Sequence, residues 1–335
     1  MTTSTKTILV AGASGYVGSR LVSQLLEEGY QVRAMGRSTL ALQNRPWARH
    51  DHLELFPADV MNTASLKAAC EGCDVVFYLV HSMNPTHRDF AEADRLAAQN
   101  MVKVAQESGL KRIIYLGGLG DDQEQLSQHL RSRREVAKIL HAGSVPVTTL
   151  QAAIIIGAGS VAFEILRYLV ERLPVMVTPR WINTETQPIA ISNVINYLVG
   201  CLKKEETMGE IFDIGGPDVV SYRQLFDIYA QEAGLSKRMI FTLPLTVPRL
   251  TSYWIELFTH ISSALARPLA EGLRNRLICH DHRIREIIPQ KLLSSREAIR
   301  LALGLVDVMK YHKLLPPEQK YPGDAVWIPT NQFRL

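Results

Sequence analysis

A glycine-rich turn near the N-terminus, ILVAGASGYVG at residues 8–18, most constrains what this chain can fold into. Gly12, Gly15 and Gly18 lie between a short apolar run and a helix-like pattern. In such a strand–turn–helix unit the first glycine permits a tight turn, the second lets a diphosphate approach the backbone, and the third lets the helix pack on the strand. The helix N-terminus offers N–H groups and a partial positive charge to phosphate. The turn therefore predicts a dinucleotide site, and a tight turn without a ligand is the alternative.

The first half of the chain alternates between strand-like and helix-like patterns. Apolar runs typical of buried strands lie at residues 7–11, 31–35, 53–56, 75–80, 112–116 and 147–156. Helical periodicity occupies residues 16–28, 63–71, 88–108 and 126–142. Strands that alternate with helices predict a parallel sheet with helices on both faces. We therefore expect an α/β fold with a doubly wound, NAD(P)-binding Rossmann core over residues 1–156.

Residues 157–335 have a less regular and mostly helical pattern. We expect helices at residues 160–172, 192–203 and 222–233, with Ser192 as an N-cap, and amphipathic helices from residue 244 onward. A loop rich in proline and polar residues is expected at 179–191, and a strand at 210–214 that returns to the core region. We interpret this half as a small substrate lobe interleaved with the core.

Cofactor specificity depends on the residues after the second predicted strand. An NAD-binding site places Asp or Glu there, about 20 residues beyond the glycines, to bind the ribose hydroxyls. This chain has MGRS at residues 35–38 and no acidic residue. Arg37 is suited to pair with a 2′-phosphate and to stack on adenine, and Ser14 can add a hydrogen bond to the same phosphate. We therefore predict NADP(H), while NAD(H) with a solvated Arg37 is the alternative.

The other strand ends complete the predicted cofactor site. Ligands of open parallel sheets bind beyond the carboxyl ends of the strands, so Asp59 and Val60 are expected at the adenine. The residues after the fourth strand are expected to line the ribose and nicotinamide. The predicted cofactor-binding residues are Gly12, Ser14, Gly15, Tyr16, Val17, Gly18, Arg37, Asp59, Val60, Leu79, Val80, His81 and Gly117.

Several segments resemble the atypical branch of the short-chain dehydrogenase/reductase superfamily. They are the glycine-rich turn, DVVFYLVHSM at residues 74–83 and KRIIYLGGLG at residues 111–120. Within that branch the chain is similar to the NAD(P)H-binding group of NmrA-like proteins and of the complex I subunit of short-chain dehydrogenase type. Blocks at 129–140, 154–181 and 187–191 resemble one enterobacterial subgroup. The resemblance implies a Rossmann core with a small interleaved C-terminal lobe and names no substrate.

The resemblance also implies a catalytic Ser or Thr, Tyr and Lys, and this chain departs from that pattern at each position. Gly117 and Gly118 stand in place of Ser or Thr, and His129 and Arg133 stand in place of Tyr and Lys. In one interpretation His129 donates a proton, because histidine titrates near neutral pH, and Arg133 supplies the positive charge. In the other interpretation both residues only orient the nicotinamide ribose, or simply cap and pair on the surface of a helix.

Two functions therefore remain open from the sequence. The first is an NADPH-dependent oxidoreductase that reduces a small carbonyl compound, enone or quinone without the usual Ser-Tyr-Lys set. The second is a non-catalytic redox sensor or assembly scaffold that binds the dinucleotide. Trp181 is a flat apolar wall for the substrate in one interpretation and a core residue in the other.

Composition narrows the expected partners. The 335 residues carry a net charge of +4 without a basic stripe interleaved with aromatics, so nucleic acid is not expected. The four cysteines lack the spacing of metal ligands, so we expect no metal. No signal peptide or transmembrane segment is expected, and the cytoplasm is the expected compartment.

The C-terminal region leaves one further question. Apolar residues recur with helical spacing at Trp254, Ile255, Leu257, Phe258 and Ile261. We expect them to pack on the substrate lobe, and contact with a membrane surface, a quinone or a protein partner is the alternative. The sequence does not indicate an oligomeric state.

Overall fold

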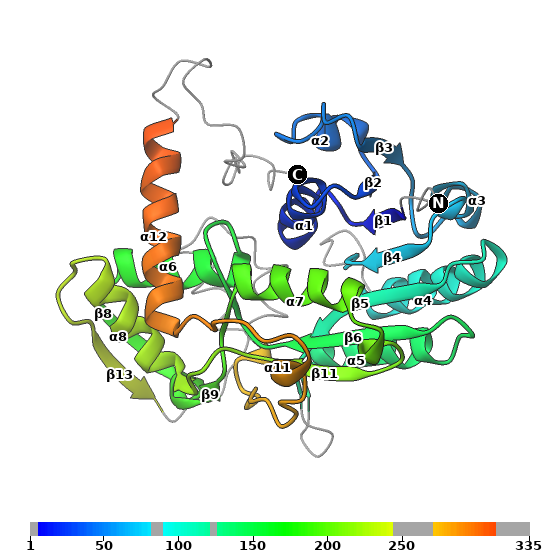
Figure 1. Ribbon diagram of the computed structural model, residues 1–335. Helices are drawn as coiled ribbons and strands as arrows, with labels where there is room; N and C mark the ends of the chain where they lie inside the picture. The colour runs from blue at the N-terminus through cyan, green and yellow to red at the C-terminus, as the bar shows by residue number, and fades with distance from the viewer. Residues whose placement is uncertain (1–5, 82–89, 121–125, 244–270, 313–335) are drawn as a thin grey trace.

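The computed structural model describes residues 6–81, 90–120, 126–243 and 271–312, and its centre is a seven-stranded sheet. The strands lie in the order β11-β6-β5-β4-β1-β2-β3, and every neighbouring pair is parallel (Figure 1). Their bounds are β1 Thr7–Ala11, β2 Gln31–Gly36, β3 Leu53–Pro57, β4 Val75–Tyr78, β5 Arg112–Gly118, β6 Val147–Ala152 and β11 Ile211–Ile214. This order confirms the predicted doubly wound α/β fold, whose topology reverses between β1 and β4.

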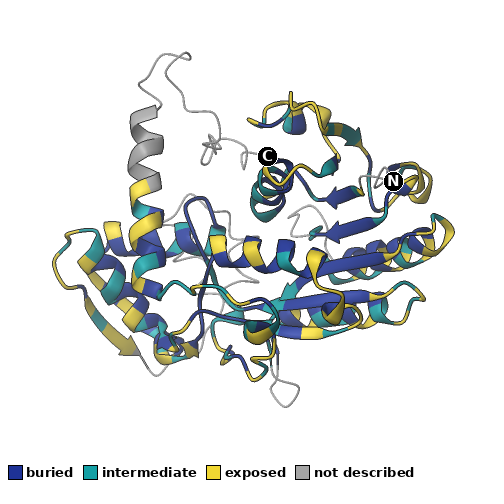
Figure 2. Cartoon of the chain, in the orientation of Figure 1, coloured by how far each residue is buried: buried dark blue, intermediate teal, exposed yellow. Residues whose placement is uncertain are grey.

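Helices cover both faces of the sheet. Their bounds are α1 Tyr16–Glu27, α2 Thr39–Gln43, α3 Thr63–Cys70, α4 Phe90–Glu107, α5 Gln128–His141, α6 Val161–Arg172, α7 Ile191–Lys203, α8 Tyr222–Glu232, α11 Ile284–Ile287 and α12 Ser295–His312. Residues of β1 alternate between two apolar clusters: Ile8 and Val10 pack towards α1 and α7, while Leu9 and Ala11 pack towards α3, α4 and α5. Figure 2 shows the central strands β1, β4 and β5 mostly in the dark blue of buried residues. Strands buried on both faces form continuous apolar runs, which explains why the sequence pattern located them.

A third apolar cluster forms the lobe beside the sheet. It joins α6, α8 and the start of α12 around the 3-10 helix η1, Arg180–Asn183. Three two-stranded sheets belong to this region: β7 Ile155–Ile156 with β10 Ile189–Ala190, β9 Glu185–Thr186 with β12 Val220–Ser221, and β8 Val175–Pro179 with β13 Met239–Leu243. A second 3-10 helix, η2, spans Glu205–Thr207 just before β11.

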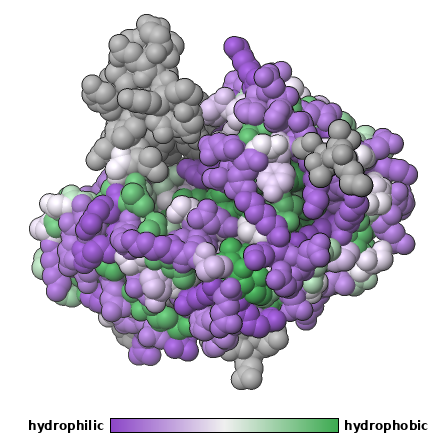
Figure 3. Space-filling model, viewed as in Figure 1, coloured by the Kyte–Doolittle hydropathy of each residue, from purple (hydrophilic) through white to green (hydrophobic). Residues whose placement is uncertain are grey.

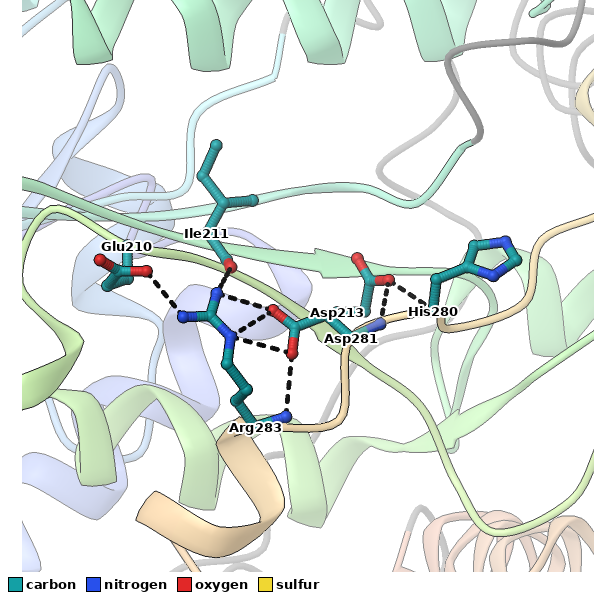
Figure 4. Close-up of polar contacts among 6 residues, drawn as sticks. All are labelled: Glu210, Ile211, Asp213, His280, Asp281 and Arg283. Atoms are coloured by element: carbon teal, nitrogen blue, oxygen red, sulfur yellow. Dashed lines mark hydrogen bonds and ion pairs between the residues drawn. The ribbon is translucent and has the colours of Figure 1, made fainter.

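Polar contacts attach a late segment of the chain to the sheet at β11. Asp213 accepts hydrogen bonds through Oδ2 from the backbone N–H groups of His280, at 2.8 Å, and Asp281, at 3.1 Å (Figure 4). Arg283 forms ion pairs with Asp281 and with Glu210, at 2.8 and 2.9 Å. Because β11 pairs in parallel with β6, these contacts hold residues from the second half of the sequence against the nucleotide-binding core.

The structure corrects two local predictions. The single strand predicted at 147–156 is wrong, because β6 ends at Ala152 and β7 pairs with β10 in a separate sheet. The predicted N-cap at Ser192 is also wrong: α7 begins one residue earlier, with Ala190 at the cap and no side-chain hydrogen bond there. Strands β8 and β13 and the short helix α2 were not predicted from the sequence, and the loop predicted at 179–191 contains η1, β9 and β10.

The surface of the described residues is mostly hydrophilic on the face seen in Figure 3, where hydrophobic residues gather in smaller patches. Exposed apolar residues include the paired side chains of β8 and β13: Val175, Val177, Met239 and Phe241. No helix in the described part of the chain is long and apolar enough to cross a bilayer. The predicted apolar face at residues 254–261 lies outside the described residues.

Candidate functional site

The glycine-rich turn leaves the sheet at β1, beside the point where the strand order reverses. The backbone N–H groups of Gly12 and Ala13 both donate to the carbonyl of Met35, at 3.1 and 3.0 Å. Gly12 has φ +93°, a conformation that favours glycine. A Cβ on Gly18 would lie 2.2 Å from the carbonyl oxygen of Gly12, so α1 packs against the turn at a distance that only glycine permits.

The N-terminus of α1 is suited to an anion. Gly15 is the N-cap and provides no side-chain hydrogen bond, and no acidic residue lies in the first turn of the helix. The leading N–H groups of a helix need partners, and a phosphate placed there satisfies them. Within the described residues, the turn therefore fits the diphosphate of a dinucleotide through its backbone.

Two arginines that the sequence pattern does not predict as site residues lie next to this turn. Arg45 donates from its guanidinium to the carbonyl of Ser14, and burial together with nearby Arg20 lowers the pKa of Arg45. Arg20 lies 4.1 Å from the ring centre of Tyr16 and donates to the carbonyl of Ala158 at 2.9 Å. Both residues thereby place positive charge close to the turn and join it to neighbouring segments.

The residues predicted to determine cofactor specificity lie at the end of β2 and in the glycine-rich turn. Arg37 is exposed, and within the described residues it has no ion pair or hydrogen bond. The Ser14 hydroxyl lies beside Gly36, 3.3 Å from where a Cβ of that glycine would be. The Ser14 hydroxyl therefore lies next to the residue that precedes Arg37 in the chain. The next hydroxyl, of Ser38, caps α2 by accepting the N–H of Ala41 at 3.2 Å.

The remaining predicted residues on the adenine side lie after β3. The carboxylate of Asp59 accepts the N–H of Met61 at 2.9 Å, so one of its oxygens stabilises the local turn. The carbonyl of Val60 accepts a hydrogen bond from Asn100 of α4, also at 2.9 Å. Asp59 is half-buried and Val60 is buried, so these residues line the predicted adenine side at the end of β3.

Residues after β4 bring the turn and the predicted catalytic region together. The backbone of Leu79 lies against Gly12, 3.0 Å from where a Cβ of that glycine would be. Two residues later, Nδ1 of His81 lies 3.3 Å from Oδ2 of Asp94 on α4. The rings of His81 and His129 are 4.9 Å apart between their centres. Asp94 was not predicted as a site residue.

Both imidazoles lie in surroundings that oppose a positive charge. Burial, followed by the nearby His81 and Arg133, lowers the pKa of His129 to about 3. Burial also lowers the pKa of His81, and Arg133 adds to this effect while Asp94 opposes it. The ring of His129 is therefore neutral at pH 7, and its buried Nδ1 has no hydrogen-bond partner within the described residues.

Arg133 connects the ends of two strands. Its guanidinium donates to the carbonyl of Leu116 on β5 and to the carbonyl of Val80 after β4, the latter at 3.5 Å. It also lies 4.9 Å from the ring centre of Tyr115. With these contacts the cation holds backbone groups around the site, beside Gly117, whose Cβ would meet the Tyr115 ring at 3.1 Å.

Trp181, on the substrate side, is a core residue: it is 9% exposed and packs edge-on against Tyr222 at 5.7 Å between ring centres. Its buried position does not support the interpretation that this side chain forms a flat apolar wall for the substrate. The described residues contain no cluster of His, Cys, Asp and Glu that could hold a metal ion.

Comparison with known proteins agrees with this geometry. Residues 12–167 match the NAD(P)H-binding family. The chain is 29% identical over 117 residues to cinnamoyl-CoA reductase 1 of Petunia hybrida, a match that covers 34% of this chain and 35% of the reductase. It is 26% identical over 224 residues to the mitochondrial NADH dehydrogenase [ubiquinone] 1 alpha subcomplex subunit 9 of Arabidopsis thaliana, covering 65% of this chain and 56% of the subunit. The chain thus spans about a third to a half of the length of these relatives.

Solved structures share the fold at low sequence identity. An NADPH-dependent quinone oxidoreductase from Escherichia coli, solved with NADPH, matches with a TM-score of 0.70, 16% identity, and 87% and 98% of the two chains covered. The triphenylmethane reductase of Citrobacter sp., solved with NADP(H), matches with a TM-score of 0.68, 17% identity, and 88% and 99% covered. Residues 12–167 of this chain thus match an NAD(P)H-binding domain, and this part of the fold is shared with solved NADPH-binding reductases.

Proposed function

We propose that this protein is an NADP(H)-dependent reductase whose substrate is a small carbonyl compound, enone or quinone. One observation carries the preference for NADP(H): Arg37 is exposed without an ionic partner in the described residues, and the Ser14 hydroxyl lies beside the preceding residue, Gly36. A guanidinium binds a 2′-phosphate through charge-assisted hydrogen bonds, whereas the ribose hydroxyls of NAD require an acidic partner that is missing here.

The protein supplies the frame for this chemistry. When bound, NADPH provides a hydride from C4 of its nicotinamide. The backbone of the glycine-rich turn and α1 would hold the diphosphate, and Arg37 with Ser14 the 2′-phosphate. The other half of the dinucleotide would then lie among His81 after β4, His129 at the start of α5 and Gly117 at the end of β5.

The low pKa of His129 bears on the substrate. A neutral imidazole is a weak acid at pH 7, so we assign His129 a hydrogen-bonding role in place of the predicted role as proton donor. Quinones and enones fit such a site best among the three substrate classes. Hydride addition to them gives an anion delocalised over oxygen and carbon, which takes its proton from water without a dedicated acid. Arg133 would keep the surrounding strand ends in place.

Two measurements test the proposal. The first is the dissociation constant for NADPH and for NADH, where we expect tighter binding of NADPH. The second follows the loss of NADPH absorbance with benzoquinones, naphthoquinones, enones, aldehydes and ketones, where we expect turnover with quinones or enones. Absence of turnover with every compound, despite tight NADPH binding, would contradict the reductase proposal.

The second candidate is a redox sensor or scaffold that binds NADPH without reducing a substrate. It is favoured by the neutral His129 and by the contacts that engage Arg133, because neither residue then replaces the usual Tyr and Lys. A sensor should bind NADPH tightly, show no turnover and be unaffected by His129→Ala in both respects. All four cysteines are buried free thiols, which fits the reducing cytoplasm that we propose as its location.

A further inference from the structure

A buried carboxylate lies behind the proposed nicotinamide side of the site. Asp94 of α4 is 3% exposed, although carboxylates are costly to bury unless hydrogen bonds compensate them. The hydroxyl of Ser132 donates to Asp94 Oδ2 at 2.9 Å, and Nδ1 of His81 lies 3.3 Å from the same oxygen. The carboxylate thus connects α4 with α5 and with the end of β4.

We propose that Asp94 is a positioning residue that keeps the proton of His81 on Nδ1, so that Nε2 of His81 accepts a hydrogen bond from the nicotinamide riboside of the cofactor. The donor on the ligand is a ribose hydroxyl or the carboxamide NH₂. This inference rests on the proposed NADP(H) site. It adds Asp94 to that site, and it assigns the tautomer of His81 and the kind of ligand group that His81 binds.

The tautomer follows from the contacts of the ring. A neutral imidazole carries one proton, and a carboxylate oxygen beside Nδ1 stabilises the form that has its proton there. The ring is neutral because burial and nearby Arg133 lower its pKa. Nε2 then carries only a lone pair. Neither buried ring nitrogen has a hydrogen-bond partner within the described residues, and it is Nδ1 that lies 3.3 Å from the carboxylate of Asp94. A buried acceptor without a partner is costly, so a ligand donor would stabilise it.

Other polar groups around His81 are consistent with this assignment. His129 packs against the ring and has a neutral side chain at pH 7. Arg133 directs its guanidinium to two backbone carbonyls. Tyr78 and Tyr115 have pKa values raised by burial, so both keep their protons. The carboxylate of Asp94 is therefore the acceptor positioned to hold the Nδ1 proton of His81.

The location on the sheet explains why the ligand group belongs to the nicotinamide half. The diphosphate is expected at the turn after β1, and Arg37 assigns the adenosine half to the side of β2. The other half of the dinucleotide then extends across β4 and β5, on the opposite side of β1. His81 follows β4, two residues after Leu79, whose backbone lies against Gly12.

The experiment compares three variants of the full chain: Asp94→Ala, His81→Phe and, as a matched control, Arg95→Ala. Arg95 is adjacent to Asp94 and pairs with Glu135 at 2.7 Å, so its removal also weakens a contact between α4 and α5 without touching His81. Affinities are measured for NADPH and for adenosine 2′,5′-bisphosphate, which lacks the nicotinamide half. The ¹⁵N shifts of the His81 ring are recorded at neutral pH, without ligand.

We expect Asp94→Ala and His81→Phe each to weaken NADPH binding by about tenfold, the value of one lost hydrogen bond, with little effect on adenosine 2′,5′-bisphosphate. In the wild type, Nδ1 should show the shift of a protonated nitrogen and Nε2 that of an unprotonated one, and Asp94→Ala should mix the two forms. Arg95→Ala should change neither result.

Two outcomes would overturn the inference: the same His81 tautomer in the wild type and in Asp94→Ala, or an equal loss of affinity for both ligands in both variants. If Asp94→Ala does not fold, the inference is tested by the affinities of His81→Phe for the two ligands and by the wild-type ¹⁵N shifts of His81. Failure of the reductase proposal alone looks different, because NADPH would then bind with the same dependence on Asp94 but without turnover.

Discussion

The turn after β1 and the histidine cluster, which consists of His81 and His129 with Asp94 and Arg133, lie at the same edge of the sheet. They differ in how their charges are placed. At the turn, backbone N–H groups and the exposed Arg37 offer positive potential to a ligand. At the cluster, the charge of Arg133 is directed to backbone carbonyls, and His129 is held neutral. Under the proposed function, the first region would determine the affinity for the dinucleotide and the choice between NADP(H) and NAD(H). The second region would determine the hydrogen bonding beside the nicotinamide.

The largest effect should come from adding one carbon to the turn. In Gly18→Ala the new Cβ would lie 2.2 Å from the carbonyl oxygen of Gly12, and both atoms belong to packed backbone. We expect a loss of about 3 kcal/mol in the free energy of unfolding, as for overpacked cores. Gly15→Ala is the matched variant: its φ of −75° suits alanine, and its Cβ would lie 3.1 Å from the same carbonyl oxygen, so its stability should fall far less while NADPH affinity falls. Urea unfolding and NADPH titration of both variants check this, and an unchanged stability for Gly18→Ala would contradict it.

The second effect separates the two dinucleotides. Arg37→Asp should weaken NADPH binding by about 100-fold, or about 2.7 kcal/mol, because it replaces a charge-assisted contact with repulsion. NADH affinity should stay the same or improve, since an acidic residue suits the ribose hydroxyls. Titration with both cofactors measures the ratio. Equal losses for the two would mean that Arg37 acts on the fold of the turn and not on the 2′-phosphate.

The third effect concerns the histidine cluster and depends on pH. The pKa of His129 is about 3 in the folded chain and about 6.5 in the unfolded one, so the unfolded state alone gains a proton as the pH falls below 6.5. Stability should thus be highest above that pH and decrease towards pH 3, with about 2 kcal/mol lost through this residue at pH 5. His129→Gln should remove that part of the loss. Urea unfolding at pH 7.5 and pH 5 measures this loss. An equal decrease in the free energy of unfolding for the wild type and for His129→Gln would show that His129 does not cause the effect.

The sequence predicted the strands of the sheet and the glycine-rich turn better than it predicted the polar contacts of the site. Buried parallel strands form continuous apolar runs, and the glycine-rich turn has a fixed order, so both are visible without knowledge of tertiary structure. Strand β8 is different: Val175 and Val177 are exposed while Met176 is buried, so apolar residues occupy both faces and no alternation marks it. Its partner β13 has the same property at Met239 and Phe241.

Asp94 and Arg45 show why part of the site was missed. Asp94 lies within a helix that has a normal amphipathic pattern, and the role proposed for it depends on contact with His81, 13 positions earlier in the sequence. Arg45 follows α2 in a segment without a recognised motif, and its contact with Ser14 spans 31 positions. Contacts of this kind depend on how the strands are arranged in space, which a single sequence does not specify.

The smallest effect should come from Arg45, and it tests whether the turn depends on its neighbours. The guanidinium donates to the carbonyl of Ser14, and burial and the charge of Arg20 lower its pKa. Arg45→Ala should loosen the turn and remove nearby positive charge, so we expect about fivefold weaker binding, or about 1 kcal/mol, for NADPH and NADH alike. Arg45→Lys keeps the charge but lacks the planar fork, and should recover part of the affinity. A loss confined to NADPH would instead place Arg45 at the 2′-phosphate with Arg37, and would extend the specificity site from the end of β2 to the segment after α2.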